Sequence, residues 1–323
     1  MEAEARQIRE LLGRATAVMV VSHKDADGDT LGCALAVGEV LRRMGKTVVV
    51  RVPEPVPEVY SFLPGFEEVN PATRADVDLV VVMDSSNRER LDGVADEMPA
   101  GVPVINIDHH VSNTRFGDVN LVVPGASSTA EVTFDLLSVL GEDITPSIAT
   151  NLYCGVMTDT GGFRHDNTGY RPLALAAELA SLGANPAHIA AMVYKRHKIS
   201  GVKLQALTMA TIGFECDDRL VHAEVTQAML RQAGALMEES EGLIDLLNSI
   251  EGLQLAILFK ELGDGNTKLS IRSREGLDAN VLAGVFGGGG HARAAGAELS
   301  LPVEAARESV LAEARRMLAD HAA

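Results

Sequence analysis

Aspartate and histidine side chains follow four separate apolar segments of this sequence. In chain order these polar residues are His23, Asp27, Asp29, Asp84, Asp108, His109, His110 and Asp159. Because the carboxyl ends of parallel strands meet in one crevice of an open sheet, we expect these side chains to converge. Converging carboxylates and imidazoles suit a pair of divalent metal ions that act on phosphate esters.

Each of these polar segments also has a purely structural explanation. Asp29 or Thr30 could cap a helix, Asp84 could do the same, and Asp159 could simply follow one. However, a carboxylate at a helix C-terminus opposes the helix dipole, which favours a ligand role for Asp159. Two adjacent histidines after a buried strand are also hard to explain as packing. We interpret His109 as a metal ligand, Asp108 as a residue that orients a ligand, and His110 as a phosphate contact or proton donor.

A glycine-rich segment marks a second candidate binding region in the C-terminal half. Four consecutive glycines, 287–290, precede His291 and could bring backbone N–H groups close to a phosphate, although a flexible hairpin has the same pattern. Arginines after predicted strands could bind further phosphate oxygens. The candidate substrate-binding residues are Gly288, Gly289, Gly290, His291, Arg272, Arg274 and, as weaker candidates, Arg90 and Arg115.

Composition narrows the classes of partner. The chain has 323 residues, 46% of them hydrophobic, and a net charge of −17. This charge disfavours duplex DNA or RNA, whose binding depends on many Lys and Arg contacts, but allows a short nucleotide substrate. No apolar run reaches the ~20 residues of a membrane span, and the N-terminus lacks a secretory pattern, so we expect a cytoplasmic protein without a membrane partner. Cys33, Cys154 and Cys216 are predicted to be buried free thiols.

Periodicity predicts an α/β fold in two parts. Apolar strands at 18–21, 48–52, 77–83 and 102–107 alternate with helices such as 30–43, which indicates a doubly wound, mainly parallel sheet. Further helices are expected at about 129–140, from 146, and at 172–182. A smaller C-terminal α/β domain across a cleft would contain strands at 220–225, 255–259, 268–271 and 297–301. We place a catalytic domain at 1–185, a basic helical linker at 186–208, and a substrate-binding domain at 209–323.

Several motifs together resemble the DHH phosphoesterases, in particular the bacterial branch that degrades very short RNA and dephosphorylates 3′-phosphoadenosine 5′-phosphate. In the N-terminal half the matching segments are 22–29 (SHKDADGD), 84–86 (DSS), 108–113 (DHHVSN), 127–131 (SSTAE) and 153–161 (YCGVMTDTG). In the C-terminal half they are 270–273 (SIRS) and 286–296 (FGGGGHARAAG). Ala26 stands where the family usually has proline, and Asp25 is an extra carboxylate without an assigned role.

The resemblance implies an N-terminal DHH domain, a C-terminal DHH-associated domain and two manganese ions. The first ion would be bound by His23, Asp27 and Asp84. The second would be bound by Asp29, Asp84, His109 and Asp159, so that Asp84 is shared. The implied activity is hydrolysis of short 5′-phosphorylated oligoribonucleotides to mononucleotides and of nucleoside bisphosphates, with Asp84, Asp108 and His110 in the reaction. A homodimer is expected by resemblance alone.

Four other interpretations compete with this one. Cyclic-dinucleotide phosphodiesterases share the core, although some carry membrane segments. Single-strand exonucleases of the RecJ type are longer, and we would expect them to have more base-stacking aromatics than the 4% found here. Manganese inorganic pyrophosphatases share the DHH motif without the glycine-rich segment. A non-catalytic nucleotide sensor would be expected to have lost ligands, and none is lost here.

Overall fold

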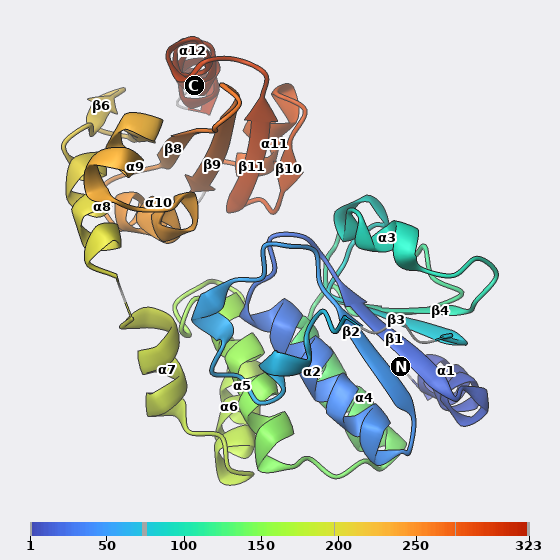
Figure 1. Ribbon diagram of the computed structural model, residues 1–323. Coiled ribbons are helices and arrows are strands. Elements are labelled where there is room, and N and C mark those ends of the chain that lie inside the picture. The colour runs from blue at the N-terminus through green and yellow to red at the C-terminus, as the bar shows by residue number, and fades with distance from the viewer. Residues whose placement is uncertain (1, 73–75, 197, 275, 322–323) are drawn as a thin grey trace. The chain divides into compact units, whose positions relative to one another are not determined.

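The computed structural model describes residues 2–72, 76–196, 198–274 and 276–321 (Figure 1). Internal contacts divide the chain into two compact units, residues 1–196 and 197–323. The expected helical linker at 186–208 contains helices α7 (Pro186–Tyr194) and α8 (Ile199–Met209), while residue 197 lies outside the described residues. The domain bounds at 185 and 209 stay a prediction. Within the described residues, no helix is long and apolar enough to cross a membrane.

The first unit is built on a five-stranded parallel sheet with the order β2-β1-β3-β4-β5. The strands are β1 (Ala17–Ser22), β2 (Thr47–Arg51), β3 (Leu79–Met83), β4 (Val104–Asp108) and β5 (Val119–Val122). The helices are α1 (Glu2–Arg14), α2 (Gly28–Arg43), α3 (Val94–Glu97), α4 (Thr129–Leu140), α5 (Pro146–Asp159), α6 (Tyr170–Ser181) and α7, with 3-10 turns at Glu58–Tyr60, Phe66–Glu68 and Glu89–Leu91. The predicted α/β fold is confirmed. The β5 strand was not predicted.

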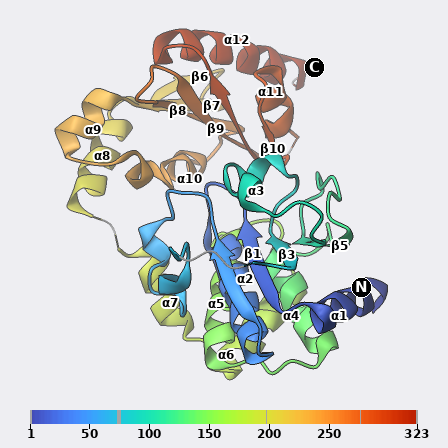
Figure 2. The same cartoon turned by 45° about the vertical axis from the view of Figure 1, so that its right-hand side comes forward.

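Helices cover the two faces of this sheet unequally. Val18 and Val20 of β1 point into a large core shared with α2, α4 and α5, which lie on the same side of the strands (Figure 2). Met19 and Val21 point to the other face, where a smaller core includes Val94 of the short helix α3. Both faces are therefore buried, which explains why the strands are continuous apolar runs instead of alternating ones.

Glycines allow α2 and α5 to cross at very short distance. A Cβ atom on Gly32 of α2 would lie 2.3 Å from the carbonyl oxygen of Asn151, and one on Gly155 of α5 would lie 2.6 Å from Asp29 Oδ1. No other residue fits these positions without a shift of the helices. The close crossing brings the start of α2, with Asp27 and Asp29, next to α5, which ends at Asp159.

The second unit contains a six-stranded mixed sheet with the order β10-β11-β9-β8-β7-β6. Its strands are β6 (Gly213–Glu215), β7 (Leu220–Val225), β8 (Leu255–Glu261), β9 (Thr267–Ser273), β10 (Gly289–Gly290) and β11 (Ala294–Leu299). Among the strand pairs of the described residues, β7–β8 is parallel and the other four pairs of this sheet are antiparallel. Helices α11 (Ala279–Val285) and α12 (Val303–His321) contribute to one core of this unit, and α8, α9 (Gln227–Ala233) and α10 (Leu243–Asn248) contribute to the other, with a 3-10 turn at Met237–Ser240.

Candidate metal centre

The candidate ligands of the first unit follow the carboxyl ends of its central strands. The strand order reverses between β1 and β3, because β2 lies outside β1 while β4 and β5 lie beyond β3. In open parallel sheets a ligand binds at such a reversal, outside the carboxyl ends of the strands. His23 directly follows β1 and Asp84 directly follows β3. The position of this site therefore follows from the strand order.

A first group joins His23, Asp27 and Asp84, whose potential ligand atoms all lie within 4.8 Å of one another. His23 Nε2 is 3.3 Å from Asp84 Oδ2, and His23 Nδ1 is 2.5 Å from the carbonyl oxygen of Lys24. Because a carbonyl only accepts hydrogen bonds, Nδ1 carries a proton there. With the Nδ1 proton held by this carbonyl, loss of the Nε2 proton leaves the tautomer whose Nε2 lone pair faces the carboxylates, as a metal ligand requires.

Asp27 also caps helix α2. Its Oδ1 accepts hydrogen bonds from the backbone N–H groups of Asp29, at 3.0 Å, and Thr30, at 2.9 Å. The alternative explanation from the sequence had assigned this cap to Asp29 or Thr30, which is wrong because both are helical residues that donate to it. Its second oxygen, Oδ2, takes no part in the cap, so the same carboxylate can start the helix and bind an ion.

A second group joins Asp29, His109 and Asp159, again with potential ligand atoms within 4.8 Å. His109 Nε2 lies 3.3 Å from Asp159 Oδ2, and its Nδ1 lies 3.2 Å from the carbonyl oxygen of Ala126. Asp29 is fully buried and accepts hydrogen bonds from the first N–H groups of α4, from Thr129 at 2.6 Å and Ala130 at 2.8 Å. The positive end of α4 thus faces a carboxylate. Asp159 is the last residue of α5, not a residue beyond it.

The two ligand groups bring several carboxylates close together, and their negative charges repel one another. Burial raises the pKa of the Asp29 carboxyl well above its usual value, and the negative charges of Asp84 and Asp159 raise it further. Burial and the charge of Asp27 do the same for the pKa of Asp159. Burial also acts to raise the pKa of Asp84, but the hydrogen bond and charge of His23 outweigh it and lower the pKa. Crowded carboxylates with mixed N and O donors fit divalent ions of the Mn, Mg or Fe kind.

His110 belongs to a separate polar chain beside these groups. Asp108 Oδ1 lies 2.7 Å from His110 Nδ1, and Asp108 Oδ2 accepts a 2.5 Å hydrogen bond from Asn113 Nδ2. His110 Nε2 lies 3.4 Å from Arg90 Nη1. Asp108 therefore orients His110, while His109 is oriented by a backbone carbonyl. His110 can also join Asp84 and His109 in a third group of potential ligands.

Sequence reasoning missed three polar side chains at this centre. The hydroxyls of Thr30 and Thr129 donate to the two oxygens of Asp84, and Asn113 bridges Asp108 and Asn106 Oδ1. Thr129 and Asn113 stand inside motifs that had been noted, but threonine and asparagine are so common in loops and helix starts that residue type gave no signal.

The structure separates the two weaker arginine candidates. Arg90 lies beside His110, as described above. Arg115 is exposed, in the loop before β5, and its charge acts on Glu4 of α1. No contact of Arg115 with the candidate ligands is present among the described residues.

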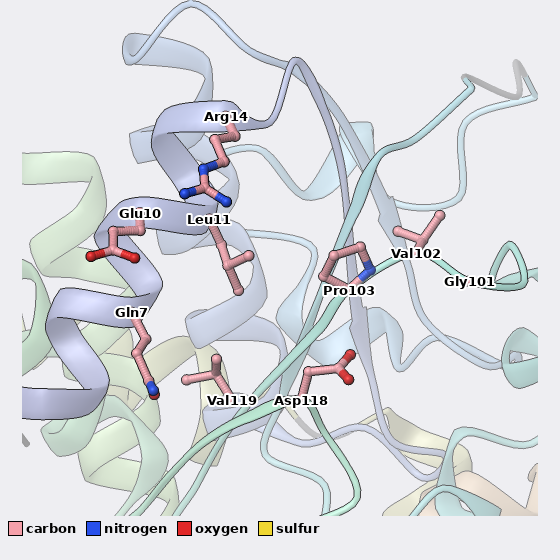
Figure 3. Close-up of a pocket in the computed structure, with 9 residues that line it drawn as sticks. All are labelled: Gln7, Glu10, Leu11, Arg14, Gly101, Val102, Pro103, Asp118 and Val119. Carbon is pink, nitrogen blue, oxygen red and sulfur yellow. The ribbon is translucent and has the colours of Figure 1, made fainter.

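A shallow hollow of about 610 Å³ also lies away from the ligands, between Leu11 and Arg14 of α1 and the segments that precede β4 and begin β5 (Figure 3).

The arginines of the second unit have partners within that unit. Arg272 Nε donates to Asp245 Oδ1 at 2.9 Å, and Arg274 Nη2 donates to the carbonyl oxygens of Asn248 and Ile250. Arg274, which follows β9, thus contacts the last residue of α10 and the segment after it. Any role in substrate binding would have to share these hydrogen bonds.

The glycine-rich segment forms a short hairpin instead of an open row of N–H donors. The N–H groups of Gly287, Gly288 and His291 donate to backbone carbonyls, and that of Gly290 donates to Asn280 Oδ1. A Cβ on Gly288 would lie 2.1 Å from the carbonyl oxygen of Gly296, so this glycine serves close packing of β10 on β11. These four N–H groups are thus occupied within the unit, and the phosphate-binding role of the segment stays a prediction. Gly289 is exposed, and a Cβ there would have no neighbour closer than 3.6 Å.

Two of the three thiols lie behind the candidate ligands. Cys33 and Cys154 are fully buried, and Cys33 Sγ is 3.5 Å from Asp29 Oδ1. Burial, followed by the charge of Asp29, raises the pKa of the Cys33 thiol well above its usual value. Cys216 is partly exposed, so its predicted burial is wrong.

Comparison with known families matches both halves of the chain. The description "DHH family, N-terminal domain" matches residues 17–156, and "DHHA1 domain" matches residues 217–320. The bifunctional oligoribonuclease and PAP phosphatase NrnA of Thermus thermophilus is 36% identical, over 93% of this chain and 90% of its own length. The protein of the same name from Bacillus subtilis is 28% identical, over 94% of this chain and 95% of its own length.

A solved structure shares the fold of the whole chain. An exopolyphosphatase-related protein from Bacteroides fragilis is similar with a TM-score of 0.90 and 27% identity, over 97% of this chain and 96% of that one. The similarity therefore extends over both units.

Proposed function

Because this chain belongs to the DHH family of metal-dependent phosphoesterases, we propose that it hydrolyses short 5′-phosphorylated oligoribonucleotides to mononucleotides and 3′-phosphoadenosine 5′-phosphate to AMP. The observation that carries the proposal is the pair of ligand groups on either side of Asp84. One group contains His23 and Asp27 with Asp84, and the other contains Asp29, His109 and Asp159.

The proposed roles of the residues follow from their contacts. Two divalent ions bound here, manganese in our proposal, would activate water and neutralise charge on the phosphoryl group. Asp84 would contact both, since it lies 3.3 Å from His23 Nε2 and 3.9 Å from His109 Nε2. Asp108 holds the His110 ring so that Nε2 faces Arg90, and this pair would bind the phosphoryl oxygens as charge develops on them.

The substrate class is supported by the relatives and by charge. Curated relatives from two bacteria are named oligoribonuclease and PAP phosphatase. A net charge of −17 favours substrates that expose few phosphates, and it disfavours duplex DNA. The proposal includes a cytoplasmic location, which the three free thiols favour because disulfides form mainly in oxidising compartments.

The second unit is proposed to contribute substrate affinity through Gly289 and His291. Both are exposed at the β10–β11 hairpin, and Gly289 leaves the backbone open to close approach. Arg272 and Arg274 are proposed to support this surface while they keep their hydrogen bonds to α10 and to the segment after it. A His291→Ala variant should raise KM with little change in kcat.

The first experiment measures nucleotide and phosphate release by the purified protein with Mn²⁺. The substrates are a 5′-phosphorylated RNA dinucleotide, an RNA 20-mer, 3′-phosphoadenosine 5′-phosphate and a cyclic dinucleotide. We expect fast turnover of the dinucleotide and the bisphosphate, and slow turnover of the 20-mer. Asp84→Ala should lose at least ~1,000-fold in kcat/KM, because it removes the carboxylate that lies between the two ligand groups and would contact both ions.

The panel distinguishes the alternatives. A preference for the 20-mer would contradict the proposal in favour of a single-strand exonuclease, and a preference for the cyclic dinucleotide would favour a cyclic-dinucleotide phosphodiesterase. No turnover of any substrate, with Mn²⁺ bound, would support a nucleotide sensor. Asp135→Asn is the control for loss of a carboxylate. Asp135 lies on α4 and forms an ion pair with Arg171 of α6, outside the ligand groups.

A further inference from the structure

We propose that Thr30 and Thr129 act together as a hydroxyl clamp that fixes the orientation of the Asp84 carboxylate for two metal ions. Thr30 Oγ1 donates to Asp84 Oδ2 at 2.8 Å, and Thr129 Oγ1 donates to Asp84 Oδ1 at 2.7 Å. Each oxygen of the carboxylate therefore has its own anchor. This inference rests on the proposed metal centre and assigns two positioning residues to it.

The clamp adds a hydroxyl donor to each oxygen of Asp84, beside the His23 contact that reaches Oδ2 alone at 3.3 Å. The terminal torsion of an aspartate is broad, so the carboxylate can rotate unless both oxygens are bonded. Asp84 follows the last residue of β3 and has a φ of +56°, a conformation that non-glycine residues rarely adopt. Its backbone N–H bonds the carbonyl oxygen of Ile107, which fixes the main chain but not the side chain.

Burial makes each hydroxyl bond consequential. Thr30 and Thr129 are fully buried and Asp84 is 2% exposed. Water therefore cannot replace a missing donor at low cost. A carboxylate that lost one anchor would turn, and its two oxygens would no longer point toward the two ligand groups.

The two hydroxyls also connect Asp84 to different ligand groups. Thr30 Oγ1 has one proton, which we assign to Asp84 Oδ2 because that contact, at 2.8 Å, is shorter than the 3.0 Å contact with Asp27 Oδ1. The same oxygen lies 2.8 Å from His23 Nε2, so it contacts two further residues of the first group. The backbone N–H of Thr129 donates to Asp29 Oδ2, in the second group. Since Thr30 is in the first turn of α2 and Thr129 begins α4, the clamp couples two helix starts to the shared carboxylate.

The test replaces each hydroxyl by a methyl group of nearly the same shape. Mn²⁺ binding to metal-free full-length protein is measured by titration calorimetry, without substrate, for Thr30→Val and Thr129→Val. We expect each variant to bind Mn²⁺ about 10- to 100-fold more weakly. With Mn²⁺ far above the new Kd, kcat should recover in part, while KM for the dinucleotide should stay within about threefold.

Matched variants distinguish the effect of losing the hydroxyl hydrogen bond from the effect of changed side-chain packing. Thr30→Ser and Thr129→Ser keep the donor and should bind Mn²⁺ within about threefold of wild type. Thr133→Val is the control on α4, the helix that begins at Thr129. Thr133 is equally buried, but its Oγ1 contacts Cys33 Sγ, at 3.7 Å, and not Asp84. Circular dichroism verifies folding, and Thr→Ala variants are used in the same way if a valine variant does not fold.

Two outcomes would overturn the clamp. In the first, the valine variants bind Mn²⁺ as tightly as wild type. In the second, the serine variants are as weak as the valine variants, which would mean that the threonine methyl group matters and the hydroxyl does not. If wild-type protein bound no Mn²⁺, the proposed function would fail together with the clamp. If it bound Mn²⁺ but cleaved none of the phosphate esters, only the proposed function would fail.

Discussion

At the scale of single residues, this centre depends on side chains that each make contacts in two directions. Asp27 caps α2 with one oxygen and leaves the other for an ion. His23 and His109 each contact a backbone carbonyl through Nδ1 and present Nε2 to carboxylates. These contacts restrict the ligands before any ion binds, which reduces the ordering that binding requires.

Asp108 gives a prediction that separates catalysis from metal binding. In Asp108→Asn the amide cannot accept from both His110 Nδ1 and Asn113 Nδ2 at the same oxygens, so the His110 ring loses its orientation. We expect kcat to fall about 100-fold, while Mn²⁺ affinity stays within about threefold of wild type. Steady-state kinetics at saturating Mn²⁺ and calorimetry measure the two quantities. A large loss of Mn²⁺ affinity would instead place Asp108 among the residues that hold the ions.

Residue types after apolar runs were enough to predict which side chains gather at this centre. They were not enough to predict what holds those side chains. The Thr129–Asp84 bond joins residues 45 positions apart, and the Asn113–Ser85 bond joins residues 28 apart. Such pairs depend on how strands and loops meet in space, and a single sequence contains no periodic signal for that.

At the scale of elements, the crossing of α2 and α5 brings the ligand segments together. Gly32 and Gly155 allow the backbone of one helix to contact the other, so the start of α2 and the end of α5 share one edge of the sheet. Helical periodicity predicted both helices. It did not predict their separation, because glycine in a helix is as compatible with an exposed position as with a crossing.

Gly32→Ala tests whether this crossing distance matters. The added Cβ would lie 2.3 Å from the carbonyl oxygen of Asn151, so the helices must move apart. We expect a loss of about 1–3 kcal/mol in the free energy of unfolding and a weaker Mn²⁺ affinity. Urea unfolding and calorimetry measure these effects. Gly13→Ala in α1, where a Cβ meets nothing within 4 Å, should be neutral or stabilising by up to about 1 kcal/mol. Equal effects of the two substitutions would contradict the argument.

The elements that sequence reasoning missed are short or lie at sheet edges. In β5 only Val119 and Leu121 are buried, so it alternates where the central strands are continuous apolar runs. The β10 strand consists of Gly289 and Gly290, which carry no side-chain pattern at all. The last strand was placed at 297–301, but it begins at Ala294. Small residues there pack closely on β9 and β10 without a hydrophobic signal.

At the scale of the whole molecule, every residue of the two ligand groups lies in the first unit, between residues 23 and 159. Metal binding without substrate should therefore stabilise that unit selectively. At 100 times its Kd a ligand of the native state adds about 2.7 kcal/mol. For a unit of this size, that corresponds to a rise in Tm of about 5–10 °C.

Metal removal tests this division. Chelation followed by addition of Mn²⁺ should raise the melting temperature, and hydrogen–deuterium exchange should show added protection in α2 and α4. The strands β7 and β8 of the second unit should exchange as before. Asp84→Ala should show a much smaller change in both measurements. Equal protection of both units in the wild-type protein would contradict a metal effect confined to the first unit.

The positions of the three cysteines allow local opening around the ligand residues to be measured by the rate of thiol labelling. Cys33 and Cys154 are sealed behind the ligand carboxylates, whereas Cys216 in the second unit is partly exposed. An alkylating reagent needs the thiolate and physical access, and burial denies both to the first two thiols. The labelling rate of Cys33 and Cys154 therefore reports how often the helices around the centre separate. Labelling of Cys216 in the same sample verifies that the reagent is active.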